Sequence, residues 1–347
     1  MLVDSPPEQR VEQVPAPPRR HAIRAVGLLA SVLVLLAVAV ASLAVGAKDL
    51  SPDQVWHGLF QDTGTYGDVV VGERLSRTVI GLLAGAALGL SGAVLQALTR
   101  NPLADPGLLG INAGASAAVV TAITFLGVTS LSGYVWFAFF GAAAVGALVW
   151  FLGGSRGATP VRLALAGTAI TAALYGYLQA VMIMDDAALG RMRFWTVGSL
   201  SSATGDMITQ VLPFFVTGTI LALALARPLN AMEMGDDTAK ALGADLHRTR
   251  ALSMLAAVVL CGAATAACGP IVFVGLMVPH VVRSFTGPDL RWILPYAAVL
   301  APVLLLGADV LGRIVVRPSE LQVGIVTAVI GGPVFIYLVR RRRTAQL

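Results

Sequence analysis

The chain has 347 residues, of which 56% are hydrophobic and only 12% are charged. Soluble domains carry about 25% charged residues, so this composition excludes an ordinary globular protein. The net charge of +5 comes from 24 basic residues against 19 acidic ones. Two of the basic residues are lysines, Lys48 and Lys240, and neither stands in the glycine-rich pattern of a phosphate-binding loop. We therefore expect that this chain has no ATPase site of that kind and is not an enzyme.

The N-terminal region divides into a polar and an apolar part. Residues 1–24 are rich in proline and mixed charge, which predicts a disordered tail. Residues 25–47 carry no charge before Lys48 and are long enough to cross about 30 Å of hydrocarbon. A signal peptide is the alternative, but its apolar core spans about 7–15 residues. The greater length here favours an uncleaved membrane anchor.

Further apolar stretches follow in chain order. The first of them contains the glycine- and alanine-rich run 84–92, and small residues of this kind let helices approach closely in lipid. Two stretches are interrupted, one near 127–133 and one at Gly269 and Pro270. The stretches are 78–99, 106–155, 163–184, 207–226, 251–282, 292–308 and 321–339. With 25–47 included and the two interrupted stretches counted twice, the sequence predicts an all-α integral membrane protein with about ten transmembrane helices over 25–340. A basic tail, 341–347, follows.

The distribution of basic residues predicts the orientation. If both termini lie in the cytoplasm, 17 of the 24 lysines and arginines fall on the cytoplasmic side, which satisfies the positive-inside rule. In that topology the similar segments 83–87 and 260–264 run in opposite directions. This weak inverted repeat is typical of transporters, in which the substrate path lies between the two halves.

Three arginines are expected at the outer face. Arg74 and Arg77 precede the stretch 78–99, where the helix dipole disfavours cations. They either snorkel to the interface or bind carboxylates of an external partner, which a guanidinium group can grip with two hydrogen bonds. Arg313 is expected to join them. Asp309 lies four residues before Arg313 and predicts an ion pair within one helix.

The longest cytoplasmic loop, 230–250, contains a predicted short helix with Asp236 as its N-cap and Gly243 as its stop. Such a helix is either a solvated connector or a lever that a soluble ATPase moves. The residues that we expect to couple to the ATPase are Gly235, Asp236, Asp237, Thr238, Ala239, Leu242 and Gly243.

A polar stripe follows one face of the segment 163–184. It consists of Thr168, Thr171, Tyr175 and Gln179, which recur at helical spacing. The stripe either makes hydrogen bonds between helices or lines a translocation path. No ionisable residue joins it, which argues against a proton or metal-ion wire.

Three motifs occur in order along the chain. They are 81–96 followed by Asn-Pro-Leu-Ala-Asp-Pro at 101–106, Gly-Pro-Ile-Val-Phe-Val-Gly-Leu-Met-Val-Pro-His at 269–280, and Asp309, Arg313 and Glu320 with 323–327. Together they resemble the permease subunits of the vitamin B12 and iron-siderophore ABC importer family, over about 74–337. Two positions depart from the family pattern, Ser76 and Gln322, where the family usually has proline.

The resemblance implies a dimer of ten-helix subunits, homomeric or heteromeric, around a central translocation path. Its partners would be two cytoplasmic ATPase subunits, which bind ATP and magnesium, and an external substrate-binding protein. No cofactor would be bound by this chain. The resemblance places docking of the binding protein at Arg74, Arg77 and Arg313, the coupling helix at 235–243, and a cytoplasmic gate at Thr159, Pro160 and Val161.

These implications lead to an expected function. The chain would be a permease subunit in a bacterial cell membrane that imports a ferric siderophore, with vitamin B12 or haem as the alternative. A transporter coupled to protons or sodium is the rival class. Such a transporter normally needs an intramembrane carboxylate, and here the sequence offers Asp309, which has a paired explanation.

Overall fold

The computed structural model describes residues 18–46, 50–61, 64–154 and 160–344. In these ranges the chain forms fourteen α-helices and one short 3-10 helix, η1. In chain order they are α1 Pro18–Ala44, α2 Pro52–Phe60, α3 Tyr66–Thr99, η1 Pro106–Leu109, α4 Ile111–Leu126, α5 Leu131–Gly154, α6 Pro160–Met184, α7 Asp186–Trp195, α8 Gly205–Ala224, α9 Ala226–Glu233, α10 Asp236–Ala241, α11 Leu246–Cys268, α12 Val274–Thr286, α13 Leu290–Val315 and α14 Val323–Thr344.

The prediction of about ten membrane helices is confirmed. Among the described residues, seven helices are long and apolar enough to span a bilayer, namely α1, α3, α5, α6, α8, α11 and α13. The shorter apolar helices α4 and α14 and the helix α12 after Gly269 and Pro270 complete the set. The first and last helices extend beyond the expected domain bounds of 25 and 340, because α1 begins at Pro18 and α14 continues to Thr344.

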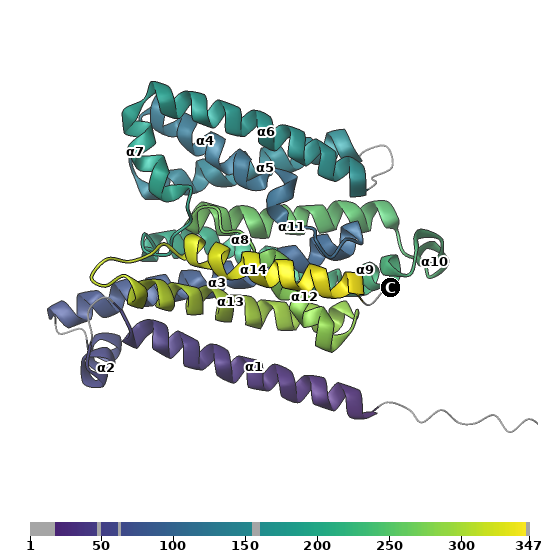
Figure 1. Ribbon diagram of the computed structural model, residues 1–347, viewed down its shortest axis with the longest axis horizontal. Helices are drawn as coiled ribbons and strands as arrows, with labels where there is room; N and C mark the ends of the chain where they lie inside the picture. The colour runs from purple at the N-terminus through teal and green to yellow at the C-terminus, as the bar shows by residue number, and fades with distance from the viewer. Residues whose placement is uncertain (1–17, 47–49, 62–63, 155–159, 345–347) are drawn as a thin grey trace, which may run out of the picture.

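The long helices lie roughly along one common direction (Figure 1). In α3 and α11, 78% of the residues in an apolar 18-residue stretch are buried, so these two helices form the core of the bundle. They pack on each other, and α13 packs on α3 while α5 and α8 pack on α11. The corresponding stretches of α1 and α6 are only 6% and 17% buried, which places both at the periphery.

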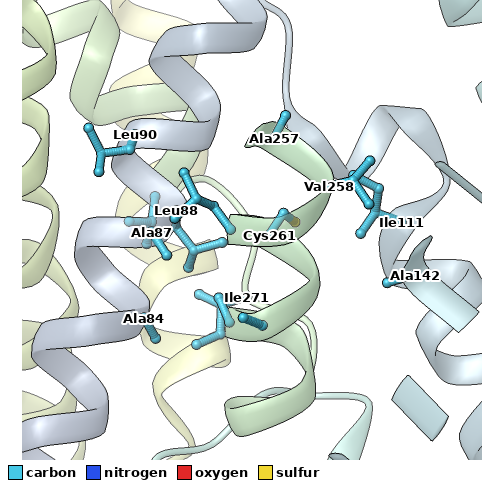
Figure 2. Close-up of a cluster of buried hydrophobic side chains, with 14 of the residues drawn as sticks. Ala84, Ala87, Leu88, Leu90, Ile111, Ala142, Ala257, Val258, Cys261 and Ile271 are labelled. Carbon is cyan, nitrogen blue, oxygen red and sulfur yellow. The ribbon is translucent and has the colours of Figure 1, made fainter. Parts of the chain in front are cut away.

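Small residues permit the close packing of α3, as the glycine-rich run predicts. A Cβ atom on Gly85 would lie 2.6 Å from the Pro302 Cα of α13, too close for any side chain. Figure 2 shows Leu88 of α3 directed toward Cys261 of α11, with Val258 and Ile111 on the far side of α11. Helices without a bulky side chain between them gain their packing energy from close backbone contact, which is the usual solution in lipid.

The bundle has two ends, which lie at opposite sides of Figure 1. One carries α2, α7 and the α13–α14 connection, and we call it the α7 end. The other carries α10, and we call it the α10 end. The sequence analysis missed α2 and α7, because both are too short to give an apolar span. The Asp185 carboxylate caps α7 by accepting hydrogen bonds from the Ala187 and Ala188 amides at 2.9 and 3.2 Å.

Candidate functional site

A buried charge network lies at the α7 end. Asp309 of α13 is fully buried and accepts hydrogen bonds from two guanidinium groups. Arg77 of α3 donates to it with Nη2 at 2.7 Å and Nε at 3.0 Å, and Arg313 donates with Nε at 3.0 Å. Arg77 also donates from Nη1 to the Glu320 carboxylate at 2.7 Å. The predicted ion pair between Asp309 and Arg313 is therefore confirmed, as one part of a four-residue network.

Arg313 and a further arginine, Arg74 of α3, hold the end of α1. Arg74 Nη1 donates to the Leu43 and Ala44 carbonyl oxygens at 3.0 Å each, and Arg313 Nη1 donates to the Ser42 carbonyl at 2.7 Å. The last four carbonyl groups of any helix lack partners within the helix. The guanidinium groups supply them here, so they fasten α1 to α3 and α13.

The environment of the three arginines differs from the one expected. The helix α3 begins at Tyr66, so Arg74 and Arg77 lie well inside it rather than at its N-terminus, and the dipole argument was wrong. The side chain of Arg313 is only 1% exposed and that of Arg74 is buried. In this conformation they are turned toward the protein. A role for the three in docking stays a prediction.

At the α10 end, Asp236 connects three segments. Its carboxylate forms ion pairs with Arg100, directly after α3, and with Arg250 of α11, the latter at 2.6 Å. Partial burial raises the pKa of Asp236, but the hydrogen bonds and charges of the two arginines outweigh that effect and lower it. The short helix α10 is thereby attached to both α3 and α11.

The short helix predicted within 235–243 is present, with one correction. Gly235 occupies the N-cap of α10 at φ +110°, so Asp236 is the first helical residue and not the cap. The reason is that its carboxylate is engaged by arginines and not by the helix amides. The expected stop is confirmed, because Gly243 adopts φ +81° directly after Leu242. Ala239 is buried, whereas Leu242 is 63% exposed.

Further contacts brace this end. Arg283 of α12 donates to the Glu233 carboxylate of α9 at 2.7 Å. Asn230 of α9 donates to the Asp289 carboxylate at 2.7 Å and accepts a hydrogen bond from the Leu290 amide at 2.9 Å. Sequence reasoning missed these partners, as it missed Arg100 and Arg250. The sequence signal for these ion pairs was that arginines and acidic residues are concentrated on the predicted cytoplasmic side.

The predicted stripe lies on the peripheral helix α6. Thr168, Tyr175 and Gln179 are exposed, and Thr171 is partly buried next to Gly110. The Thr168 hydroxyl donates to the Ala164 carbonyl within its own helix at 2.8 Å. The stripe is therefore a polar face on an otherwise apolar helix.

The expected gate residues lie at the start of α6. Thr159 is outside the described residues, and Pro160 is the first residue of the helix. Val161 is exposed and borders a cavity of about 290 Å³ that Asp105 also lines. Burial raises the pKa of Asp105 to about 6, although a hydrogen bond from the Gly107 amide acts in the opposite direction. Sequence reasoning did not single out this carboxylate as a separate group.

Comparison with known proteins agrees with this architecture. The chain is 45% identical over 324 residues to the ferric enterobactin transport system permease protein FepD of Escherichia coli (strain K12), covering 92% of this chain and 96% of that one. It is 37% identical to the hemin transport system permease protein HmuU of Yersinia pestis, covering 91% and 95%. A solved metal-chelate type ABC transporter in an inward-facing conformation has a TM-score of 0.81 at 28% identity, covering 91% of this chain and 99% of that one.

The fold, the multi-pass topology and these likenesses agree on one class of protein. The chain is a membrane permease of the ABC importer type, a transporter rather than an enzyme. The model of the FecCD transport family matches residues 33–341. The protein therefore belongs to the FecCD transport family.

Proposed function

We propose that this protein is the permease subunit of an importer for ferric siderophores, driven by ATP that a separate subunit hydrolyses. The observation that carries the proposal is the 45% identity to a ferric enterobactin permease over 92% of the chain. The likeness to a hemin permease, at 37% identity, keeps haem as the second candidate cargo. The chain itself would bind no ATP, and both of its termini would lie in the cytoplasm of a bacterium.

The polar stripe on α6 supports a path between two permease subunits. Thr168, Tyr175 and Gln179 are exposed on a helix whose apolar stretch is only 17% buried. In lipid such polar groups would lack hydrogen-bond partners, which is costly. A second permease subunit on this face would enclose the stripe, and the stripe would then line the translocation path. Thr159, Pro160 and Val161 at the start of α6 would form its cytoplasmic gate.

The α10 end is suited to dock the ATPase. Leu242 and Met234 are exposed on either side of α10, and Asp237 and Thr238 are exposed on it. An apolar pair flanking a short polar helix offers a partner both burial and orientation. The ion pairs of Asp236 would transmit the movement of that partner to α3 and α11.

The α7 end would receive the external binding protein. Of the three arginines expected to dock it, Arg77 is the one joined to a partly exposed acid, because the Glu320 side chain is 33% exposed. A carboxylate of the binding protein would compete with Glu320 for the guanidinium group of Arg77. Arg74 and Arg313 would keep α1 in place during that exchange.

The test is uptake into proteoliposomes that contain the permease, its ATPase and its binding protein. Radioactive iron is supplied as a ferric siderophore in one arm and as haem in the other. Accumulation of the siderophore iron in excess over haem is expected. Accumulation of haem alone would show that haem is the cargo, and accumulation of neither would refute the proposal.

A further inference from the structure

A second cavity, of about 370 Å³, lies at the α7 end. It is separate from the charge network and from the α6 stripe. Its walls come from the α4–α5 connection and the first turn of α5, from α7 and the loop that follows it, from the last residue of α11 and from the residue before α14. Its volume falls in the range of small-molecule sites, about 300–1,000 Å³. The residues that define its chemistry are Arg191, Trp195, Ser199, Ser201, Ser202 and Gln322.

These side chains form a surface of hydrogen-bond donors with one positive charge. Arg191 offers a guanidinium group, Trp195 an indole N–H and Gln322 an amide, while the serines add hydroxyl groups. Among the described residues that line the cavity there is no aspartate or glutamate. Within the described part of the chain, Arg191 also has no acid within ion-pair distance. The lining of the cavity therefore carries a net positive charge, and Asp185, the N-cap of α7, acts on Arg191 electrostatically from outside that lining.

The walls of the cavity are fixed by backbone hydrogen bonds. The Ser199 amide donates to the Cys268 carbonyl at 2.8 Å, and the Gly324 amide donates to the Gly198 carbonyl at 3.1 Å. Gly198 adopts φ +81°, and a Cβ on Gly324 would overlap the Val197 carbonyl oxygen. The loop after α7 is thus clamped between the ends of α11 and α14. Donors held in this way lose little conformational freedom when a ligand binds.

The hydroxyl groups are likewise held in place. The Ser199 and Ser201 hydroxyls lie 2.8 Å apart, and the Ser201 amide donates to the Ser199 hydroxyl at 3.1 Å. The Trp195 carbonyl at the end of α7 accepts a hydrogen bond from the Gly198 amide, and the Cys268 carbonyl at the end of α11 accepts one from the Ser199 amide.

We propose that this cavity recognises one lobe of a ferric chelate that carries net negative charge and presents anionic oxygen atoms. This inference rests on the proposed function and names the class of its cargo. Three doubly charged catecholates around Fe³⁺ leave three surplus negative charges, whereas three singly charged hydroxamates leave none. Arg191 distinguishes the two classes, since a hydrogen bond to a charged group is stronger than one between neutral groups.

The test measures binding to the assembled permease–ATPase complex in nanodiscs, without the binding protein. The probes are iron-55 as the anionic tris-catecholate complex and as the neutral tris-hydroxamate complex. We expect the wild type to bind the anionic probe more tightly. Arg191→Gln should weaken binding of that probe about tenfold or more and leave the neutral probe unchanged. Gln322→Glu, which places an acid in the cavity, should also weaken binding of the anionic probe.

The matched control is Arg193→Gln, which removes a charge from the same helix but not from the cavity lining. It should bind both probes as the wild type does. Equal affinity of the wild type for the two probes, absence of binding, or unchanged binding by Arg191→Gln would each overturn the inference, and so would an equal loss in Arg193→Gln. Uptake of both chelates by the complete importer would leave the proposed function intact and remove only the charge selectivity.

Discussion

At the scale of single residues, Asp309 is the carboxylate that two guanidinium groups share, those of Arg77 and Arg313. Both Asp309 and Arg313 are essentially inaccessible to solvent, with exposed fractions of 0% and 1%. Removing one member of a buried ion pair leaves an uncompensated charge, which costs about 3–5 kcal/mol. The end of α1 depends on the same arginine, because Arg313 donates to the Ser42 carbonyl. The network is therefore a structural support for three helices.

The substitution Asp309→Asn should lower the free energy of unfolding by about 3–5 kcal/mol, since Arg77 and Arg313 would lose their shared carboxylate. The control is Glu320→Gln. Glu320 is 33% exposed, and Arg77 would keep Asp309, so the expected loss is within about 1 kcal/mol. Denaturant unfolding in detergent micelles measures both. Equal stabilities of the two variants would contradict this account of the network.

At the scale of elements, the ion pairs of α10 with neighbouring segments come from Asp236, in its first turn. Asp236 forms ion pairs with Arg100 and Arg250, whereas the neighbouring Asp237 is exposed. Partly exposed ion pairs contribute about 0.2–1 kcal/mol each. That is too little to determine whether the protein folds, but enough to change how firmly α10 is held to α3 and α11.

The substitution Asp236→Asn should reduce uptake severalfold relative to the ATP hydrolysed, because α10 would no longer move α3 and α11 with it. Asp237→Asn keeps both ion pairs and changes only the exposed face of α10, so it should lose less than Asp236→Asn. The measurement is iron accumulated per ATP hydrolysed by the reconstituted importer. A larger loss in Asp237→Asn than in Asp236→Asn would show that the exposed face of α10, and not its attachment, carries the coupling.

At the scale of the whole molecule, the bundle follows directly from the sequence. Long apolar runs identify α3, α8, α11 and α13, because a span needs about 20 apolar residues and little else. Short amphipathic helices such as α7 give no comparable signal, so the cavity that α7 lines was not predicted. The ion pair of Asp309 with Arg313 was predictable from a spacing of four. The one with Arg77 was not, because the two residues are 232 positions apart.

Parts of the candidate site were predicted and parts were not, again because the sequence reveals local elements and not long-range contacts. The short helix α10 was predicted because a glycine stands at each side of a short polar segment, at Gly235 and Gly243. The prediction that Asp236 is the N-cap was wrong, because its arginine partners come from distant segments. Local signals identify elements, whereas the partners of a charged side chain depend on tertiary packing.

The central claim is that movement of this permease is driven from the α10 end by a separate ATPase. The most direct test follows iron-55 siderophore uptake into proteoliposomes that hold the complete importer, with ATP and the proton gradient varied independently. The account predicts that uptake stops when ATP is withdrawn and continues when a protonophore removes the gradient. Uptake that continues without ATP and stops with the protonophore would contradict it.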